Sequence, residues 1–256
     1  MTTSITYEFP LNERIRVFIR IEQLFIQLQH FLVETTISDT RAAIKTLMDL
    51  LVIFSRNDIK SEIIKEIDRH IKAFSLMSDM QGVDVAKLKS ILNDLDQMSK
   101  RLYAANGKLG ASVMQSDLFQ SISQRSAIPG GTCSFDLPGF HYWLEQDGAV
   151  LRHDLEQWIR PFNDIRQAID LLLNFIRKSG RATEEIAQAG FFQLALDSSQ
   201  LYQLLLIKLD RNLPYFAETS GGKHRFTIRI MSPSAEGGRP GQTQENVPFT
   251  LTCCSF

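Results

Sequence analysis

Most of the chain carries the hydrophobic period of α-helices. From residue 11 to about residue 178, apolar residues recur at steps of three and four, the spacing of one helix face. The clearest stripe starts after Pro10, where Asn12 is a suitable N-cap. It consists of Ile15, Phe18, Ile21, Phe25, Leu28 and Leu32. Further apolar residues, Ile26 among them, widen this stripe, so we predict a helix buried over most of its circumference.

The same period predicts further helices as far as residue 178. We expect Ser38 or Asp39 to cap the second helix and Asp84 to cap the fourth. The last has Pro161 in its first turn, where proline is tolerated. The predicted ranges are 39–54, 57–74, 84–102, 115–123, 138–145, 151–159 and 161–178.

After Gly180 the pattern changes from the helical period to alternation. Between 224 and 231, Phe226, Ile228 and Ile230 alternate with polar residues, which predicts a strand with one buried face. Residues 232–246 are rich in glycine and proline and predict a hairpin loop. The strands predicted in this part of the chain are 191–196, 201–209, 224–231 and 248–253.

A break at 128–138 interrupts the helical pattern. Pro129 and Pro138 mark element boundaries, and the pair Gly130–Gly131 suits a tight turn. Such a break predicts that the chain crosses to another part of the fold. Alternating apolar residues make 133–137 a candidate strand, and the same pattern at Ile5, Tyr7 and Phe9 predicts a strand that joins the C-terminal sheet.

These elements predict an α+β fold. A mostly helical domain spans 11–180, interrupted by the 128–138 segment. A smaller antiparallel β-domain is built from 1–10 and 181–256, with 133–137 as a candidate addition. No internal repeat is evident.

Composition and charge do not identify a partner. The 256 residues are 44% hydrophobic and 22% charged, with a formal net charge of −1, as in ordinary globular proteins. A site for an anionic ligand must therefore be a local patch. No signal peptide is evident, and the most apolar helical stretch, 168–176, is too short to span a bilayer. With only three cysteines, we expect a protein of the reducing cytoplasm without direct membrane insertion.

The motifs of catalysis and metal binding are weak. The string SGGKH at 220–224 lacks parts of a phosphate loop and precedes a strand. Cys133, Cys253, Cys254 and His141 would form a zinc site only if their segments met, and adjacent cysteines in a strand point to opposite faces. Buried apolar thiols are the favoured interpretation. We therefore expect no catalytic residues, no metal and no cofactor.

Two sets of basic residues remain. On the first helix, a polar stripe consists of Arg16, Arg20, Gln23, Gln27 and His30. In the strand at 224–231, Arg225 and Arg229 point the same way, about 13 Å apart, and Lys223 precedes them. Guanidinium groups bind carboxylates in a bidentate manner, which suits an acidic or carboxyl-bearing peptide. From spacing alone, solvated arginines paired with acidic residues of the same chain are favoured. A nucleic-acid or anionic-surface binding module using the same patch is the alternative function.

Several segments, in order, resemble the ZapD family of bacterial cell-division proteins. They are FPLNERIRVFIRIEQL at 9–24, IPGGTCSFDLP at 128–138 with His141 and Trp143 after it, DSSQLY at 197–202, SGGKHRFTIRIM at 220–231, and the paired cysteines at 253 and 254. At one place ahead of the IPGG run where relatives can carry arginine, this chain has Asp117. That difference argues against a basic contact from the short helix there.

The resemblance implies a non-enzymatic protein with a helical domain and a β-domain that forms a symmetric homodimer. Such proteins bind the C-terminal tail of FtsZ, the tubulin-like polymer of the division ring (Z-ring), and bundle its filaments at mid-cell during septation. The tail-binding surface of the family corresponds here to Arg16, Arg20, Arg56, His141, Arg225 and Arg229. Nucleic acid is not expected as a partner.

Overall fold

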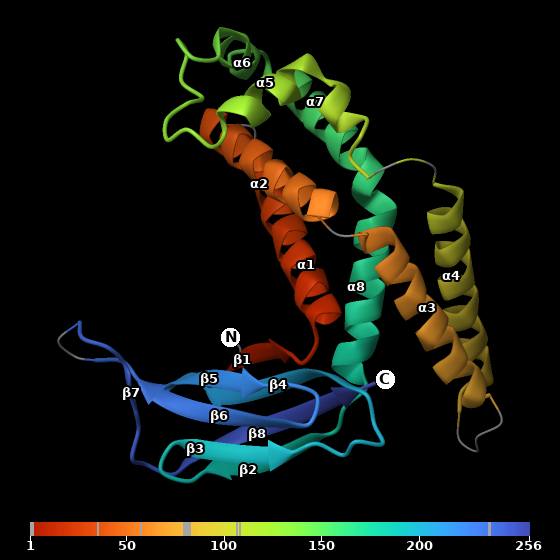
Figure 1. Ribbon diagram of the computed structural model, residues 1–256, viewed down its shortest axis with the longest axis vertical. Coiled ribbons are helices and arrows are strands. Elements are labelled where there is room, and N and C mark those ends of the chain that lie inside the picture. The colour runs from red at the N-terminus through yellow and green to blue at the C-terminus, as the bar shows by residue number, and fades with distance from the viewer. Residues whose placement is uncertain are drawn as a thin grey trace. The chain divides into compact units, whose positions relative to one another are not determined.

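The computed structural model describes residues 3–34, 36–56, 58–78, 83–105, 107, 109–234 and 237–256. The chain divides into two compact units. The β unit comprises Met1–Ile19 and Leu171–Phe256, and the helical unit comprises Arg20–Asp170. Helices and two antiparallel sheets make this an α+β fold, which confirms the predicted fold class (Figure 1).

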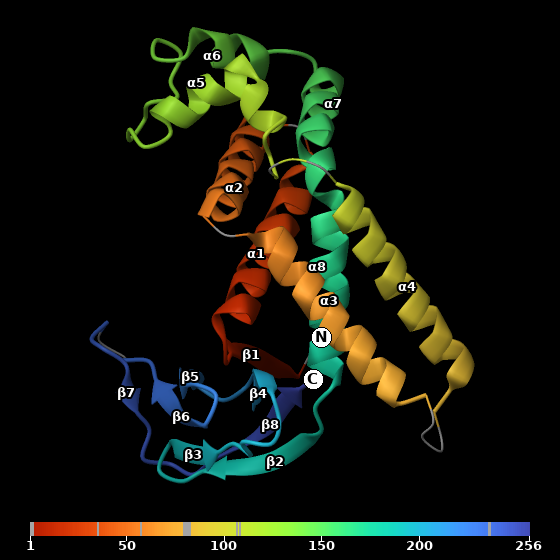
Figure 2. The same cartoon turned by 45° about the vertical axis from the view of Figure 1, so that its right-hand side comes forward.

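The predicted helices are confirmed to within a few residues at their ends. The 3₁₀ turns η1 and η2 precede α5 and α8, and the predicted first turn of the last helix, with Pro161, belongs to η2. The observed elements are α1 (Glu13–Phe31), α2 (Ile37–Arg56), α3 (Ile59–Leu76), α4 (Val85–Ala104), η1 (Val113–Gln115), α5 (Asp117–Arg125), α6 (Pro138–Leu144), α7 (Gly148–Ile159), η2 (Arg160–Phe162) and α8 (Asn163–Lys178). Figure 2 shows α3 and α4 side by side. Asn57, the predicted start of the third helix, lies outside the described residues.

Capping side chains explain where several helices begin. Asn12 Oδ1 accepts a hydrogen bond from the Ile15 amide at 3.0 Å, as predicted. Asp84 caps α4 through the Lys87 amide, also at 3.0 Å. The predicted cap of α2 was wrong, because Thr36 Oγ1 accepts from the Asp39 amide at 3.1 Å and donates to the Asp39 carboxylate. Thr36 is therefore the capping residue of α2, and the Asp39 side chain, three residues later, supports the cap by accepting a hydrogen bond from its hydroxyl group.

The buried stripe of α1 is narrower than predicted. Ile15, Phe18 and Ile21 are fully buried, and Phe25 and Leu28 nearly so. Ile26, expected to widen the stripe, is 51% exposed. The opposite face of α1 is therefore available to solvent.

Two sheets form the β unit. The first has the order β1–β4–β8–β2, and in the second β6 lies between β3 and β5, with β7 paired to the end of β6. All pairings are antiparallel. The strands are β1 (Ser4–Pro10), β2 (Ala182–Ala187), β3 (Phe191–Ala195), β4 (Tyr202–Asp210), β5 (Phe216–Gly221), β6 (Arg225–Ser232), β7 (Gly241–Gln242) and β8 (Val247–Ser255). β1 joins the C-terminal strands through β4, as predicted, whereas β2, β5 and β7 were not predicted.

The core of the β unit contains residues of both sheets. Leu205, Ile207 and Leu209 of β4 pack in one cluster with Phe226, Ile228 and Ile230 of β6. Burying one face of each sheet against the other leaves the second face of the β3–β6–β5 sheet free for polar residues.

The strand predicted at 133–137 does not exist. Residues 126–136 form successive turns, in which backbone amides donate to carbonyls three or four residues earlier, as Cys133 does to Gly130 and Leu137 to Cys133. The alternation was misleading because Phe135 is 84% exposed rather than packed. The segment also stays within the helical unit, so the expected crossing to another part of the fold was wrong. It is anchored there by Arg41, whose guanidinium donates to the Thr132 carbonyl at 3.1 Å.

Candidate partner-binding site

The outer face of the β3–β6–β5 sheet displays two arginines. Arg225 and Arg229 are exposed and lie four residues apart on β6, whereas Phe226, Ile228 and Ile230 are buried in the core of the β unit. Alternate residues of a strand point to opposite faces. The predicted amphipathic pattern of this strand is therefore confirmed, and both guanidinium groups project from one surface.

The register of the sheet defines the neighbours of these arginines. Arg229 lies opposite Phe191 on β3 and opposite Glu218 on β5. Directly opposed residues share a face, with Cβ atoms about 4.5–5.5 Å apart. Two residue pairs further along, on the same face, the hydroxyl groups of Thr227 and Ser220 are hydrogen-bonded at 2.9 Å. The surface thus combines cationic, hydroxyl and aromatic groups.

Lys223 continues this surface in the turn between β5 and β6. It is exposed, as is His224 beside it. The turn is closed by the Gly222 amide, which donates to the Arg225 carbonyl at 3.0 Å. Across the ranges the structure describes, no ion pair is formed by Lys223, Arg225 or Arg229. Pairing with acidic residues of the same chain, which spacing alone favoured, is not what the structure shows for these three.

The polar stripe predicted on α1 is confirmed. Arg20 is exposed, and Gln23, Gln27 and His30 continue the same line of exposed residues. Arg16, one turn before Arg20, is half-buried and its Nε lies 3.3 Å from a carboxylate oxygen of Glu13. The Glu13 side chain is 73% exposed, so this ion pair within one helix turn is weak. Another carboxylate can therefore compete with Glu13 for the Arg16 guanidinium.

Arg56 and His141, named from the family resemblance, are also exposed. Arg56 is the last residue of α2 and lines a cavity of about 300 Å³ together with Asp58 and Lys60. His141 lies on α6, with its Nδ1 3.9 Å from Glu145. These two belong to the helical unit together with Arg20, whereas Arg16, Lys223, Arg225 and Arg229 belong to the β unit. That all seven side chains belong to one binding surface stays a prediction.

The three cysteines differ in burial. Cys254 is fully buried and Cys253 partly buried, on opposite faces of β8. Burial raises the pKa of each thiol to about 11, so both are protonated near neutral pH. Cys133 donates to the Asp136 carboxylate at 3.3 Å. In the described part of the chain, no three potential ligands of a metal gather, and none of the described helices is both long and apolar enough to cross a membrane.

Comparison with known proteins identifies the family. The family model described as "ZapD: Cell division protein" matches residues 19–229. The chain belongs to the ZapD family. The cell division protein ZapD of Methylococcus capsulatus is 45% identical over 254 residues, which cover 99% of each chain. That of Chromobacterium violaceum is 34% identical over 252 residues, covering 98% of this chain and all of the relative.

Membership of the ZapD family agrees with the resemblance read from the sequence. The match to the family model includes α1 from Ile19 onward, the IPGG turns and β6 as far as Arg229. Arg16 lies ahead of this match but within the near full-length similarity to the relatives. The family assignment gives the chain a role in cell division.

Proposed function

We propose that this protein is a non-enzymatic, cytoplasmic division factor that binds the C-terminal tail of FtsZ at mid-cell and, as a homodimer, bundles FtsZ filaments. The observation that carries the proposal is the exposed pair Arg225 and Arg229 on one face of β6, without an ion pair among the described residues. Arg16, Arg20, Arg56, His141 and Lys223 are the other proposed contacts.

The chemistry of this surface suits an acidic peptide. An arginine that is not already paired can form two parallel hydrogen bonds to one carboxylate. Arg225 and Arg229 are about 13 Å apart along an extended strand, and hydroxyl groups lie between them. An extended peptide can therefore place two of its carboxylates on the two arginines.

Bundling follows from symmetry and from the number of tails. A twofold dimer presents the same surface twice, and each filament carries many tails. Ordering a disordered tail makes each contact modest, but many simultaneous contacts give avidity without a tight single site. The two surfaces of the dimer then hold two filaments together.

Co-sedimentation with FtsZ filaments tests the proposal. The double variant Arg225→Glu, Arg229→Glu is expected to weaken pelleting with filaments at least tenfold, since a charge-assisted hydrogen bond contributes about 1.5–3 kcal/mol. The matched control is Lys208→Glu, Arg211→Glu, which changes the net charge equally at two other exposed residues of the β unit. Equal pelleting of the two double variants would refute the proposed site.

A second measurement separates the peptide from a generic polyanion. We expect fluorescence anisotropy to show tighter binding of a synthetic FtsZ tail peptide than of random DNA of equal charge. The carboxylate of Glu218 opposite Arg229 repels a dense row of phosphates more than it repels spaced carboxylates. Preferential binding of DNA would favour the nucleic-acid alternative.

A further inference from the structure

β3 (Phe191–Ala195) is an edge strand with an open side. In the described residues it pairs with β6 alone, apart from a bridge between Gln188 and Phe191 in the preceding turn. At its two ends, Gly190 accepts from the Ile230 amide and the Leu196 amide donates to His224, both at 2.8 Å. Hydrogen-bonded pairs alternate along an antiparallel ladder. The even-numbered residues of β3 therefore bond to β6, and the odd-numbered ones direct their amides and carbonyls to the open side.

Among the described residues, the N–H and C=O groups that Gln193 and Ala195 direct to the open side have no hydrogen-bond partner. The Phe191 amide, the first of the odd-numbered set, already donates to the Gln188 carbonyl at 2.9 Å. Two residues that expose N–H and C=O in the same direction form the template on which another strand can pair.

β3 differs from β1, β2 and β5 in what protects its edge. Sheet edges are commonly blocked by charged residues or proline. β1 carries Glu8 and Pro10, β2 carries two glutamates and β5 carries Glu218. β3 has the sequence FFQLA, with neither charge nor proline. Among β1, β2, β3 and β5, it is the strand whose edge is least protected against strand pairing.

Apolar groups flank this edge on both faces. Phe191 points to the outer face, because it opposes Arg229, and Leu194 points to the inner face, because it opposes Phe226. Each is 38% exposed. An added strand would therefore find one partly exposed apolar side chain on each side of its own backbone.

Positively charged side chains near the β3 edge favour an acidic peptide as the added strand. Arg225 and Arg229 share the outer face with Ala195 and Phe191 and lie directly opposite them. A strand added to β3 would lie two strand spacings, about 10 Å, from β6, a gap that an arginine and a carboxylate side chain bridge together. Lys223 and His224 are exposed at the start of β6, where it opposes the end of β3. The occupant should be acidic.

We propose that the β3 edge binds an acidic, extended peptide as an added strand. This inference rests on the proposed function and specifies how the FtsZ tail binds: its backbone pairs with Gln193 and Ala195. Because the two arginines are four residues apart, carboxylates at positions i and i+4 of the peptide face them. Residues of the peptide between these positions alternate, so those on the other face contact Leu194 and favour apolar side chains.

Proline substitution tests the backbone pairing. Ala195→Pro removes an amide that points to the open side, while the ladder to β6 is kept, and edge strands tolerate proline at such positions. We expect the affinity for a synthetic FtsZ tail peptide to fall at least tenfold. The matched control is Thr219→Pro on β5, whose amide also points away from β6 by the same alternation and which should bind within twofold of the unmodified protein. Circular dichroism verifies that both variants are folded.

N-methylated peptides give an answer that does not depend on the variants folding. Strand pairing predicts that methylating alternate amides of the tail peptide weakens binding to the unmodified protein about tenfold, and that methylating the intervening amides does not. Uniform tolerance of methylation, with unchanged binding by Ala195→Pro, would overturn strand addition. If Arg225→Glu, Arg229→Glu still abolished binding, the proposed function would stand without it. If the unmodified protein did not bind the peptide at all, both would fail.

Discussion

Arg177 and Glu8 form a bidentate ion pair between the last helix and the first strand. Nε of Arg177 donates to Oε1 of Glu8 at 2.7 Å and Nη2 donates to Oε2 at 2.9 Å. The residues are 169 positions apart, and their side chains are 28% and 25% exposed. The pair attaches β1 to the end of α8 within the β unit, whose two segments lie at opposite ends of the sequence.

Removing this pair should destabilise the β unit. Arg177→Ala leaves the partly buried Glu8 carboxylate without its bidentate partner. We therefore expect the free energy of unfolding to fall by about 1–2 kcal/mol. Urea unfolding followed by circular dichroism measures the change. Lys178→Ala is the control, because Lys178 is the exposed neighbour in the same last turn of α8 and should change stability by less than about 0.5 kcal/mol. Equal effects of the two variants would contradict this role of the pair.

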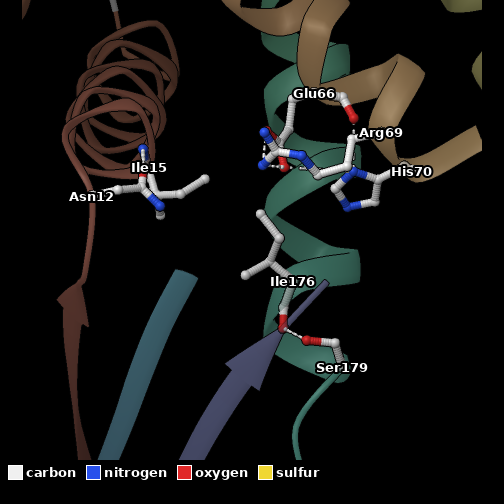
Figure 3. A network of polar contacts seen from close by, with 7 residues as sticks. All are labelled: Asn12, Ile15, Glu66, Arg69, His70, Ile176 and Ser179. Atoms are coloured by element: carbon white, nitrogen blue, oxygen red, sulfur yellow. Dashed lines mark hydrogen bonds and ion pairs between the residues drawn. The ribbon is translucent and has the colours of Figure 1, made fainter. Parts of the chain in front are cut away.

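His70 is a buried histidine on α3 with two charged neighbours (Figure 3). Its Nδ1–H donates to the Glu66 carbonyl at 2.9 Å, and the buried Glu66 carboxylate pairs with Arg69 at 3.0 Å. Burial lowers the pKa of His70 below its ordinary 6.5, although the Glu66 carbonyl and carboxylate act in the opposite direction. His70 is therefore neutral in the folded protein near pH 7.

Acid should destabilise the protein through His70. Below about pH 6.5 the unfolded chain binds a proton at this histidine, whereas the folded chain does so only at lower pH. Stability therefore falls as the pH falls below 6.5, by up to about 1.4 kcal/mol per pH unit. Urea unfolding between pH 7.5 and pH 5 should show a shallower slope for His70→Gln than for the unmodified protein. His153→Gln changes an exposed histidine and should keep the slope of the unmodified protein. If His70→Gln also kept that slope, His70 would not be the group that makes stability depend on pH.

The sequence predicted strongly patterned elements well and weakly patterned ones poorly. The buried stripe of α1 and the alternation of β6 are long enough to define both an element and its buried face. β2 (ATEEIA) and β5 (FAETSG) contain few apolar residues, and their extended shape depends on pairing with β8 and β6. Pairing with a neighbouring strand overrides local preference here.

The candidate site was predictable as residues but not as a surface. The exposure of Arg225 and Arg229 follows from the burial of Phe226 and Ile228 on the opposite face of the strand. Arg229 lies between Phe191 and Glu218 because of the strand register. The alternation within one strand does not predict that register. Likewise, which side of β3 is open depends on its pairing with β6, and the residues of β3 alone do not specify that partner.

Gly130 and Gly131 should respond differently to alanine. Gly130 has a φ of +73°, and an added Cβ would meet no atom within 4 Å. Gly130→Ala should therefore lower stability only by the energy of a left-handed backbone at alanine, about 1–2 kcal/mol. At Gly131 a Cβ would lie 2.8 Å from the Arg125 carbonyl oxygen and from Ile128 Cβ, so the turn itself must move. We expect Gly131→Ala to destabilise the helical unit more than Gly130→Ala in thermal unfolding. The reverse order would show that the turn adapts easily.

Binding of the FtsZ tail should weaken with salt. The proposed contacts are exposed guanidinium groups, and the screening length falls from about 10 Å at 0.1 M salt to about 3 Å at 1 M. Raising the salt from about 0.05 M to about 0.5 M should lower the affinity for the tail peptide at least tenfold, as measured by fluorescence anisotropy. The variant Arg225→Gln, Arg229→Gln should bind weakly at low salt and lose little more at high salt, because most of the screened interaction is already absent. An affinity of the unmodified protein that does not change with salt would mean that apolar contacts, such as those of Phe191 and Leu194, hold the peptide instead.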